Sequence, residues 1–273
     1  MIILKNQSTD VDSNLKRLLR IHLNRNVLKE YEECMMNGRY FSAANIAKTF
    51  ELKEKERNAA LLAYKLHMNQ ENYEHYKSAA QIAMEFGLGD DKVKSAALKA
   101  YIICLEKESY LVAAQIAMEF GLGDDRVKRA ALKEYEILFA DNNSFAAQIA
   151  KDFELGDDKV RRAALKGYKR CLIQKDYESA AAISKEFGLG EDKEKVAAFK
   201  AYKIYFTKKD YTYAARIARD FKLKDEEKCA AIKACEEFLK NNRYLDAAQI
   251  AKYHSLGTEI IEGTQKLFHL LTR

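Results

Sequence analysis

An alanine pair recurs along the chain at nearly constant spacing, and this repeat constrains the fold more than any other feature of the sequence. The first alanine of the pair falls at seven positions, 33 to 36 residues apart: Ala43, Ala79, Ala113, Ala146, Ala180, Ala214 and Ala247. The sequence AAQIAMEFGLGDD occurs twice without change, at residues 79–91 and 113–125. A period near 34 residues is typical of helical-repeat arrays, in which each unit buries its apolar face only by stacking on its neighbours.

Each repeat is expected to form two helices. Apolar residues at three- and four-residue spacing predict a long helix over residues 91–108 and a short helix over residues 110–120. Gly121-Leu122-Gly123 follows the short helix, and a glycine just past the last turn supplies the left-handed residue that ends a helix. Aspartates are expected as N-caps of the long helices: Asp90 or Asp91, Asp124 or Asp125, Asp157 or Asp158, Asp192 and Asp225. The chain holds no proline, which also favours nearly continuous helix.

Small and bulky residues are expected to have different roles in the packing of the helices. The alanines let helix backbones approach closely, and larger residues such as Ile116 and Phe120 are expected to fill the space between hairpins. A tyrosine three residues before the alanine pair is expected at the turn between the helices: Tyr40, Tyr76, Tyr110, Tyr177, Tyr211 and Tyr244. A second tyrosine position, in the long helix, is expected to be buried: Tyr31, Tyr64, Tyr101, Tyr135, Tyr168 and Tyr202, with Cys235 in the last repeat.

The period, the hairpin layout and segments such as YLVAAQIA resemble the tetratricopeptide-like superfamily of helical hairpin repeats, over about residues 27–257. Three features depart from the tetratricopeptide family proper: Ala97 stands where that family has a large residue, Tyr101 stands where it has a small one, and the closing proline is absent. The resemblance is therefore to the superfamily, and the peptide-clamp residues of the family are not transferred to this chain.

We therefore expect an all-α fold, a right-handed α-solenoid of about seven two-helix hairpin repeats with capping helices. Residues 27–257 would form the solenoid as a single domain. Residues 1–26 would form an N-terminal cap or degenerate half-repeat, and residues 258–273 a C-terminal capping helix. In the last repeat His254 replaces the recurring phenylalanine, as expected where stacking ends.

Charge and hydropathy exclude few partners. The formal net charge is +6, from 47 basic and 41 acidic residues, and this permits an anionic partner without requiring one. The first ten residues, MIILKNQSTD, contain too short an apolar run for a secretory signal peptide. No stretch approaches the length of about 18 apolar residues that a membrane span needs. We therefore expect a cytoplasmic protein without a membrane partner.

No catalytic, cofactor-binding or metal-binding residue is predicted, and the chain is expected not to be an enzyme. Cys34, Cys104 and Cys171 share one position of the long helix, where other repeats have Leu138, Tyr205 and Phe238, so this position is interpreted as part of the core. Cys229 and Cys235 show no CxxC spacing, and all five cysteines are expected to be packed, reduced thiols. The histidines show no HExxH pattern, and GLGDD is not a phosphate-binding loop.

One stripe of the long helices does not have the composition of a core. A lysine precedes the buried tyrosine position by two residues in six of the seven repeats, with Leu62 the exception. We call these residues the lysine row: Lys29, Lys99, Lys133, Lys166, Lys200 and Lys233. Further cations of the same face are Arg129, Arg162, Lys169, Arg170 and Lys203, and residues 159–170 form the densest basic segment. The resemblance implies that the long helices line a concave groove with these cations. A solvated face is the alternative, because glutamates such as Glu33, Glu136 and Glu236 can pair with the lysines along the helix.

Three functions stay open at this point. The first is a scaffold that binds a protein or peptide, acidic in composition, in the groove. The second is a single-stranded RNA-binding protein whose lysines follow the phosphates, although buried tyrosines would offer no stacking surface for bases and no groove position varies as a base-reading code would. The third is a structural or oligomerisation module. The sequence leaves the partner and the oligomeric state open.

Overall fold

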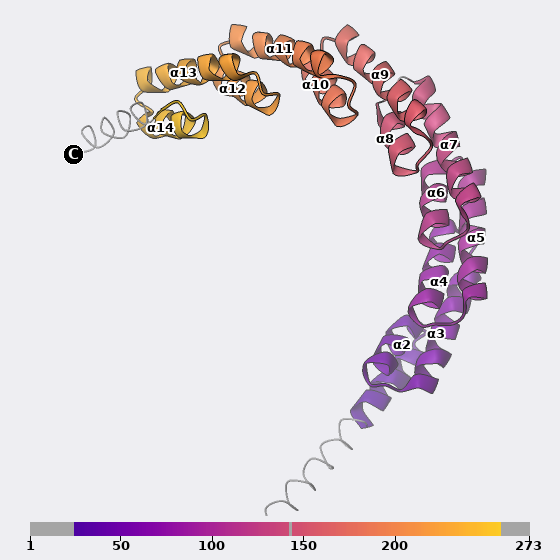
Figure 1. Cartoon of the computed structure of the whole chain (residues 1–273). Coiled ribbons are helices and arrows are strands. Elements are labelled where there is room, and N and C mark those ends of the chain that lie inside the picture. The colour runs from indigo at the N-terminus through magenta and orange to yellow at the C-terminus, as the bar shows by residue number, and fades with distance from the viewer. Residues whose placement is uncertain (1–24, 142–143, 258–273) are drawn as a thin grey trace, which may run out of the picture. The chain divides into compact units, whose positions relative to one another are not determined.

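The computed structural model describes residues 25–141 and 144–257, and all regular structure within these ranges is helical (Figure 1). Residues 25–36 form the first described helix. The later long helices are α3 (Lys53–Met68), α5 (Asp90–Glu106), α7 (Asp124–Ala140), α9 (Asp157–Ile173), α11 (Glu191–Thr207) and α13 (Lys224–Lys240). The short helices are α2 (Tyr40–Thr49), α4 (Tyr73–Glu85), α6 (Tyr110–Glu119), α8 (Phe145–Asp152), α10 (Tyr177–Glu186), α12 (Tyr211–Asp220) and α14 (Tyr244–Tyr253).

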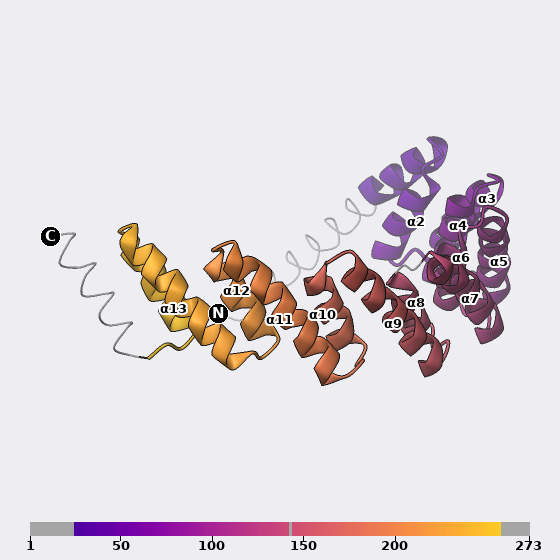
Figure 2. The ribbon, with the colours of Figure 1, turned by 90° about the horizontal axis from the view of Figure 1, so that it is seen from above.

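The chain divides into two compact units, residues 1–131 and 132–273, with the division inside α7. In the first unit each helix from α2 to α6 packs on the next, and in the second unit the same holds from α8 to α14. Seen from above, the hairpins of the second unit follow one another in chain order (Figure 2). The predicted all-α solenoid of helical hairpins is therefore confirmed. The two predicted caps fall almost entirely on residues 1–24 and 258–273, outside the described residues.

Within the second unit the long and short helices form two layers. In Figure 1 this row of hairpins curves gently, with α10, α12 and α14 on the inner side and α11 and α13 on the outer side. The resemblance implies long helices on the inner face, and for this unit that expectation is wrong. Tyr168 and Tyr202 reach from one long helix to the next, and their rings space this layer more widely than alanines would.

The short helices end as the sequence predicts. Gly121 has a φ of 60°, its N–H donates to the Met118 carbonyl, and the Leu122 N–H donates to the Ala117 carbonyl at 2.9 Å. These two bonds define a Schellman motif, in which the residue after the glycine folds back on the helix. Leu122 is accordingly buried.

The predicted aspartate N-caps are wrong. Gly89, Gly156 and Gly190, with φ between 108° and 119°, precede the helices α5, α9 and α11 as their N-caps. Asp90 lies in the first helical turn, and no side-chain capping hydrogen bond forms at this end. The aspartates instead place negative charge beside the positive end of the helix dipole, which stabilises the helix without capping it.

The core follows the predicted division between small and bulky residues. Both alanines of the pair are buried in all seven short helices, and Ile116 and Phe120 are buried between hairpins. All six long-helix tyrosines are buried, with exposed fractions between 4% and 9%. Within the described residues no helix is both long enough and apolar enough to cross a membrane.

Candidate binding surface on the long helices

The structure places most of the lysine row on the surface of the long helices. Lys99 lies in the first unit on α5, and Lys29 lies there in the helix of residues 25–36. Lys133, Lys166, Lys200 and Lys233 lie in the second unit, on α7, α9, α11 and α13. Five of the six are exposed, and Lys166 is half-buried. Of the neighbouring cations, Arg129, Arg162, Lys169, Arg170 and Lys203 are also exposed. The row therefore forms two sets, one for each unit.

Three lysines of the row pair with glutamates of their own helix. The Nζ atom of Lys233 lies 2.8 Å from a carboxylate oxygen of Glu236, and that of Lys133 lies 3.7 Å from Glu136. Lys29 approaches Glu33 only to 3.9 Å. Both members of each pair are largely exposed, so each pair contributes about 0.2–1 kcal/mol at most. An external anion can compete for these lysines at small cost.

Two further lysines of the row rest on the turn tyrosines. The ammonium of Lys99 lies 5.3 Å from the centre of the Tyr76 ring, and that of Lys200 lies 5.4 Å from the Tyr177 ring. Each contact joins a long helix to the short helix before it. An exposed cation–π contact contributes about 0.5–1 kcal/mol. It therefore orients the lysine but leaves its ammonium able to bind an anion.

Lys166 differs from the rest because the α7–α8 turn lacks this tyrosine. The sequence has asparagine at position 143, where most other repeats have tyrosine. Lys166 instead donates to the Phe139 carbonyl at 2.5 Å and lies 4.2 Å from the centre of the Phe139 ring. The Arg170 guanidinium donates to the Asp141 carbonyl at 2.9 Å, and Arg162 lies 5.7 Å from the Phe139 ring.

The basic segment of residues 159–170 therefore has a structural role at the end of α7. Carbonyls of the last helical turn have no partners within the helix and form its negative end. Lys166 satisfies one of them, and Arg170 satisfies the carbonyl that follows. The densest basic segment of the sequence is thus partly explained by packing, which sequence spacing alone does not reveal.

A second set of cations, on the short helices, was missed by the sequence analysis. Lys151, Lys185 and Arg219 each lie five residues after the first alanine of the pair. They lie over the aromatic ring at the end of the next short helix, at 5.7 Å from Phe187, 5.3 Å from Phe221 and 3.9 Å from Tyr253. Lys185 and Arg219 also donate to the Asp220 and Tyr253 carbonyls. The sequence shows these cations at a fixed distance before the position of the recurring phenylalanine. This regular spacing indicates that they pack on the ring of the next repeat.

The buried tyrosines form a regular series of hydrogen bonds between successive long helices. In five repeats the hydroxyl donates to the carbonyl of the third residue of the next long helix, at 3.2 to 3.5 Å: Tyr31 to Lys55, Tyr64 to Lys92, Tyr101 to Arg126, Tyr135 to Lys159 and Tyr168 to Lys193. Tyr202 instead contacts the side chain of Cys229. These rings hold the array together and offer no face to a nucleobase. We call these six residues the tyrosine row.

The cysteines are mostly core residues. Cys34, Cys104 and Cys235 are buried, and Cys171 is half-buried. Burial raises the pKa of the Cys104, Cys171 and Cys235 thiols, so these three stay protonated and unreactive at neutral pH. The prediction that Cys229 is packed is wrong, because it is exposed. Cys229 immediately precedes the buried Ala230-Ala231 pair. The equivalent residues of two other repeats, Arg129 and Arg162, are exposed as well.

Two histidines meet in the first unit. The Nδ1 atoms of His67 and His75 lie 3.1 Å apart, and burial, together with His75, lowers the pKa of His67. This favours the neutral form of the His67 ring. Among residues 25–141 and 144–257, no group of three or more His, Cys, Asp or Glu side chains is placed to hold a metal ion.

Comparison with known proteins does not identify this surface. No protein-family model matches the chain, and no curated protein matches it at a meaningful level.

Proposed function

We propose that this chain is a non-enzymatic helical-repeat scaffold of the tetratricopeptide-like kind, cytoplasmic, whose partner is a protein or peptide segment rich in acidic residues. The partner would lie across the long helices of the second unit. The observation that supports this most is the lysine repeated at one position of the long helices, which is exposed in three of the four hairpins of this unit: Lys133 on α7, Lys200 on α11 and Lys233 on α13.

The contacts of these lysines favour a carboxylate ligand. Lys133 and Lys233 already hold glutamates, at 3.7 and 2.8 Å, so their geometry suits this group. These exposed pairs are weak, and an acidic segment that spans several hairpins gains from several such contacts at once. Lys169 and Lys203 add exposed positive charge to the same helices.

Single-stranded RNA fits the surface less well. RNA-binding proteins of this kind combine cations with aromatic rings that stack on bases. Here the tyrosine row is buried, and Lys166 and Arg170 are engaged with the end of α7.

A titration with two anionic probes tests the proposal. A fluorescently labelled polyglutamate peptide and a labelled oligouridylate of similar charge are added to the full chain at low salt and at about 0.15 M salt. We expect saturable binding of the peptide, weaker binding of the RNA, and loss of at least about tenfold in peptide affinity when Lys133, Lys200 and Lys233 are changed to Glu.

The matched control changes Lys151, Lys185 and Arg219 to Gln, which removes an equal number of cations from the short helices. This variant should bind the peptide like the unchanged chain, once its helicity is confirmed by circular dichroism. Lys133, Lys200 and Lys233 changed to Gln provide the comparison at equal loss of charge. Equal affinity of the Lys→Glu variant and the unchanged chain would refute the proposal. Preferential binding of oligouridylate would favour the RNA-binding alternative.

A further inference from the structure

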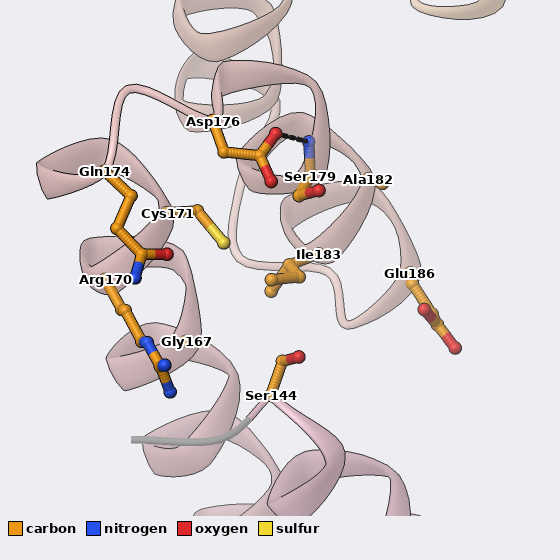
Figure 3. A pocket seen from close by; sticks show the side chains of 10 residues that line it. All are labelled: Ser144, Gly167, Arg170, Cys171, Gln174, Asp176, Ser179, Ala182, Ile183 and Glu186. Carbon is orange, nitrogen blue, oxygen red and sulfur yellow. Dashed lines mark hydrogen bonds between the residues drawn. The ribbon is translucent and has the colours of Figure 1, made fainter. Parts of the chain in front are cut away.

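The second unit contains an open pocket of about 460 Å³ between α8, α9 and α10 (Figure 3). Cys171 and Gln174 line it from α9, Ser179 and Ile183 line it from α10, and Ser144 lies at its edge before α8. In Figure 3 the Cys171 thiol and the Ile183 side chain point toward each other across this space, while Glu186 points away. We call it the ring pocket.

The neighbouring joint, between α10, α11 and α12, shows what fills the same place elsewhere in this chain. By repeat register, Tyr205 stands where α9 has Cys171, and Tyr213 stands where α10 has Ser179. The centres of these two rings lie 4.3 Å apart. The Tyr213 hydroxyl donates to both carboxylate oxygens of Glu178, at 3.0 and 3.1 Å, and the Arg216 guanidinium lies 4.0 Å over the Tyr213 ring.

The ring pocket has a smaller residue at each of the four positions that Tyr205, Tyr213, Glu178 and Arg216 occupy in the neighbouring joint. Besides the two tyrosines, Glu178 is replaced by Ser144 and Arg216 by Ala182. Residue 167 contributes as well: it is glycine where α11 has Ala201, and a Cβ there would lie 3.1 Å from the Ser144 Cβ. Both joints have the same order of helices, but the ring pocket lacks the two aromatic rings of the neighbouring joint. The pocket therefore lies where those rings would be.

The lining suits a phenol. Ile183 provides an apolar surface, and burial raises the pKa of the Cys171 thiol, so this wall stays uncharged at neutral pH. The Asp176 carboxylate accepts a hydrogen bond from the Ser179 N–H and, like the Gln174 amide, has further capacity to pair with a hydroxyl. In the neighbouring joint the carboxylate that pairs with the tyrosine hydroxyl is Glu178, and Ser144 takes its place here, so by repeat register the phenol oxygen falls beside the Ser144 hydroxyl.

We propose that the ring pocket binds a tyrosine side chain presented by a protein partner, which takes the place that Tyr213 takes in the neighbouring joint. This inference rests on the proposed function, since it names one residue type that the partner must contain. Binding of one ring in a preformed pocket typically provides a large share of the specificity of an interface. The exposed Lys169 on the same helix suits acidic residues beside that tyrosine.

The first experiment uses 4-methylphenol, which has the side chain of tyrosine, and the full chain with ¹³C-labelled isoleucine methyl groups. We expect a saturable chemical-shift change of Ile183, and none of Ile217, which occupies the equivalent position in the filled joint. The variants Ser179→Tyr and Cys171→Tyr each place a ring in the pocket, and each should abolish the change at Ile183. A change that persists in a folded variant, or that fails to saturate, overturns the proposal.

The second experiment uses two acidic peptides that differ only by tyrosine or alanine at one position. The tyrosine peptide should bind the unchanged chain about tenfold more tightly, and this gain should vanish in Ser179→Tyr. The Lys133, Lys200 and Lys233 to Glu variant should weaken both peptides alike and keep the ratio between them. Equal affinity of the two peptides overturns the ring-pocket proposal even if 4-methylphenol binds. Failure of both peptides to bind, with the shift at Ile183 intact, refutes the acidic partner instead.

Discussion

At the scale of single residues, the tyrosine row links stability to pH. Burial raises the pKa of all six phenols above 10. The folded chain therefore retains protons that the unfolded chain releases once the pH passes about 10. The resulting stability is fully present below that pH, and it is lost as the pH rises toward the folded-state pKa values.

We expect the urea midpoint of unfolding to fall as the pH rises above about 10, and to fall less steeply in Tyr168→Phe. At neutral pH the same variant should lose about 0.5–1.5 kcal/mol, because the bond from its hydroxyl to the Lys193 carbonyl is absent. Urea titrations monitored by circular dichroism at a series of pH values measure both effects. An unchanged slope above pH 10 would show that Tyr168 ionises equally in both states.

Residue types also explain which cap positions the sequence could reveal. Gly121 was predictable as a left-handed residue, because glycine adopts this conformation without strain. Glu154 and Lys222 adopt it at the same position of other repeats, with φ of 51° and 58°, and nothing in their chemistry indicates this. The sequence analysis did not predict them, and only the structure identifies their left-handed backbone. Asp90 was misplaced by one position, because Gly89 can adopt the φ of 109° that begins the helix.

At the scale of helices, the end of α7 depends on a side chain from the next hairpin. Lys166→Met keeps most of the apolar stem and removes the bond to the Phe139 carbonyl and the charge over the Phe139 ring. We expect a loss of about 1–3 kcal/mol in unfolding free energy, because the bond is charge-assisted and lies at the negative end of a helix. Urea unfolding measures this loss.

Lys133→Met is the matched control for that variant. It stands at the same position of α7, exposed, with Glu136 as a weak partner, so its loss should stay below about 0.5 kcal/mol. Equal losses in the two variants would contradict the structural role given to Lys166. The contrast also shows why the sequence overestimated residues 159–170 as a binding patch: Lys133 and Lys166 are equivalent in the repeat, and the bond from Lys166 to the Phe139 carbonyl appears only in the structure.

At the scale of the whole molecule, the repeat was the most predictable feature because every hairpin uses the same small set of contacts. The period and the buried positions Ile116, Phe120 and Tyr101 followed from spacing alone. The ring pocket did not, since it arises from the difference between two joints, and such a difference is visible only after the joints are placed side by side.

The doubled sequence AAQIAMEFGLGDD makes the number of hairpins testable. A chain without residues 92–125 joins Asp91 to Arg126, which is the same local sequence that Asp125 and Arg126 form in the unchanged protein. Arg126 then becomes the third residue of the helix that receives the Tyr64 hydroxyl, the position that Lys92 holds now. Nearest-neighbour contacts dominate such arrays, so we expect the shortened chain to fold with undiminished helicity per residue and a somewhat lower thermal midpoint.

Circular dichroism and thermal unfolding decide this prediction. A chain without residues 92–113 provides the control, because this deletion is shorter than one period and breaks the register of the hairpins. It should lose helicity per residue and unfold without a sharp transition. Similar loss in both deletions would mean that distant hairpins contribute more to stability than adjacent ones.

The tyrosine row gives the array a direction. Five of its six hydroxyls donate to a carbonyl of the C-terminal neighbour, so a hairpin has a donor side and an acceptor side, as the subunits of a polar filament do. At the last described position of the series stands Cys235, whose thiol is bonded to the Ala247 carbonyl of its own hairpin. A helix stacked beyond α13 would therefore meet the Cys235 thiol in place of a phenol.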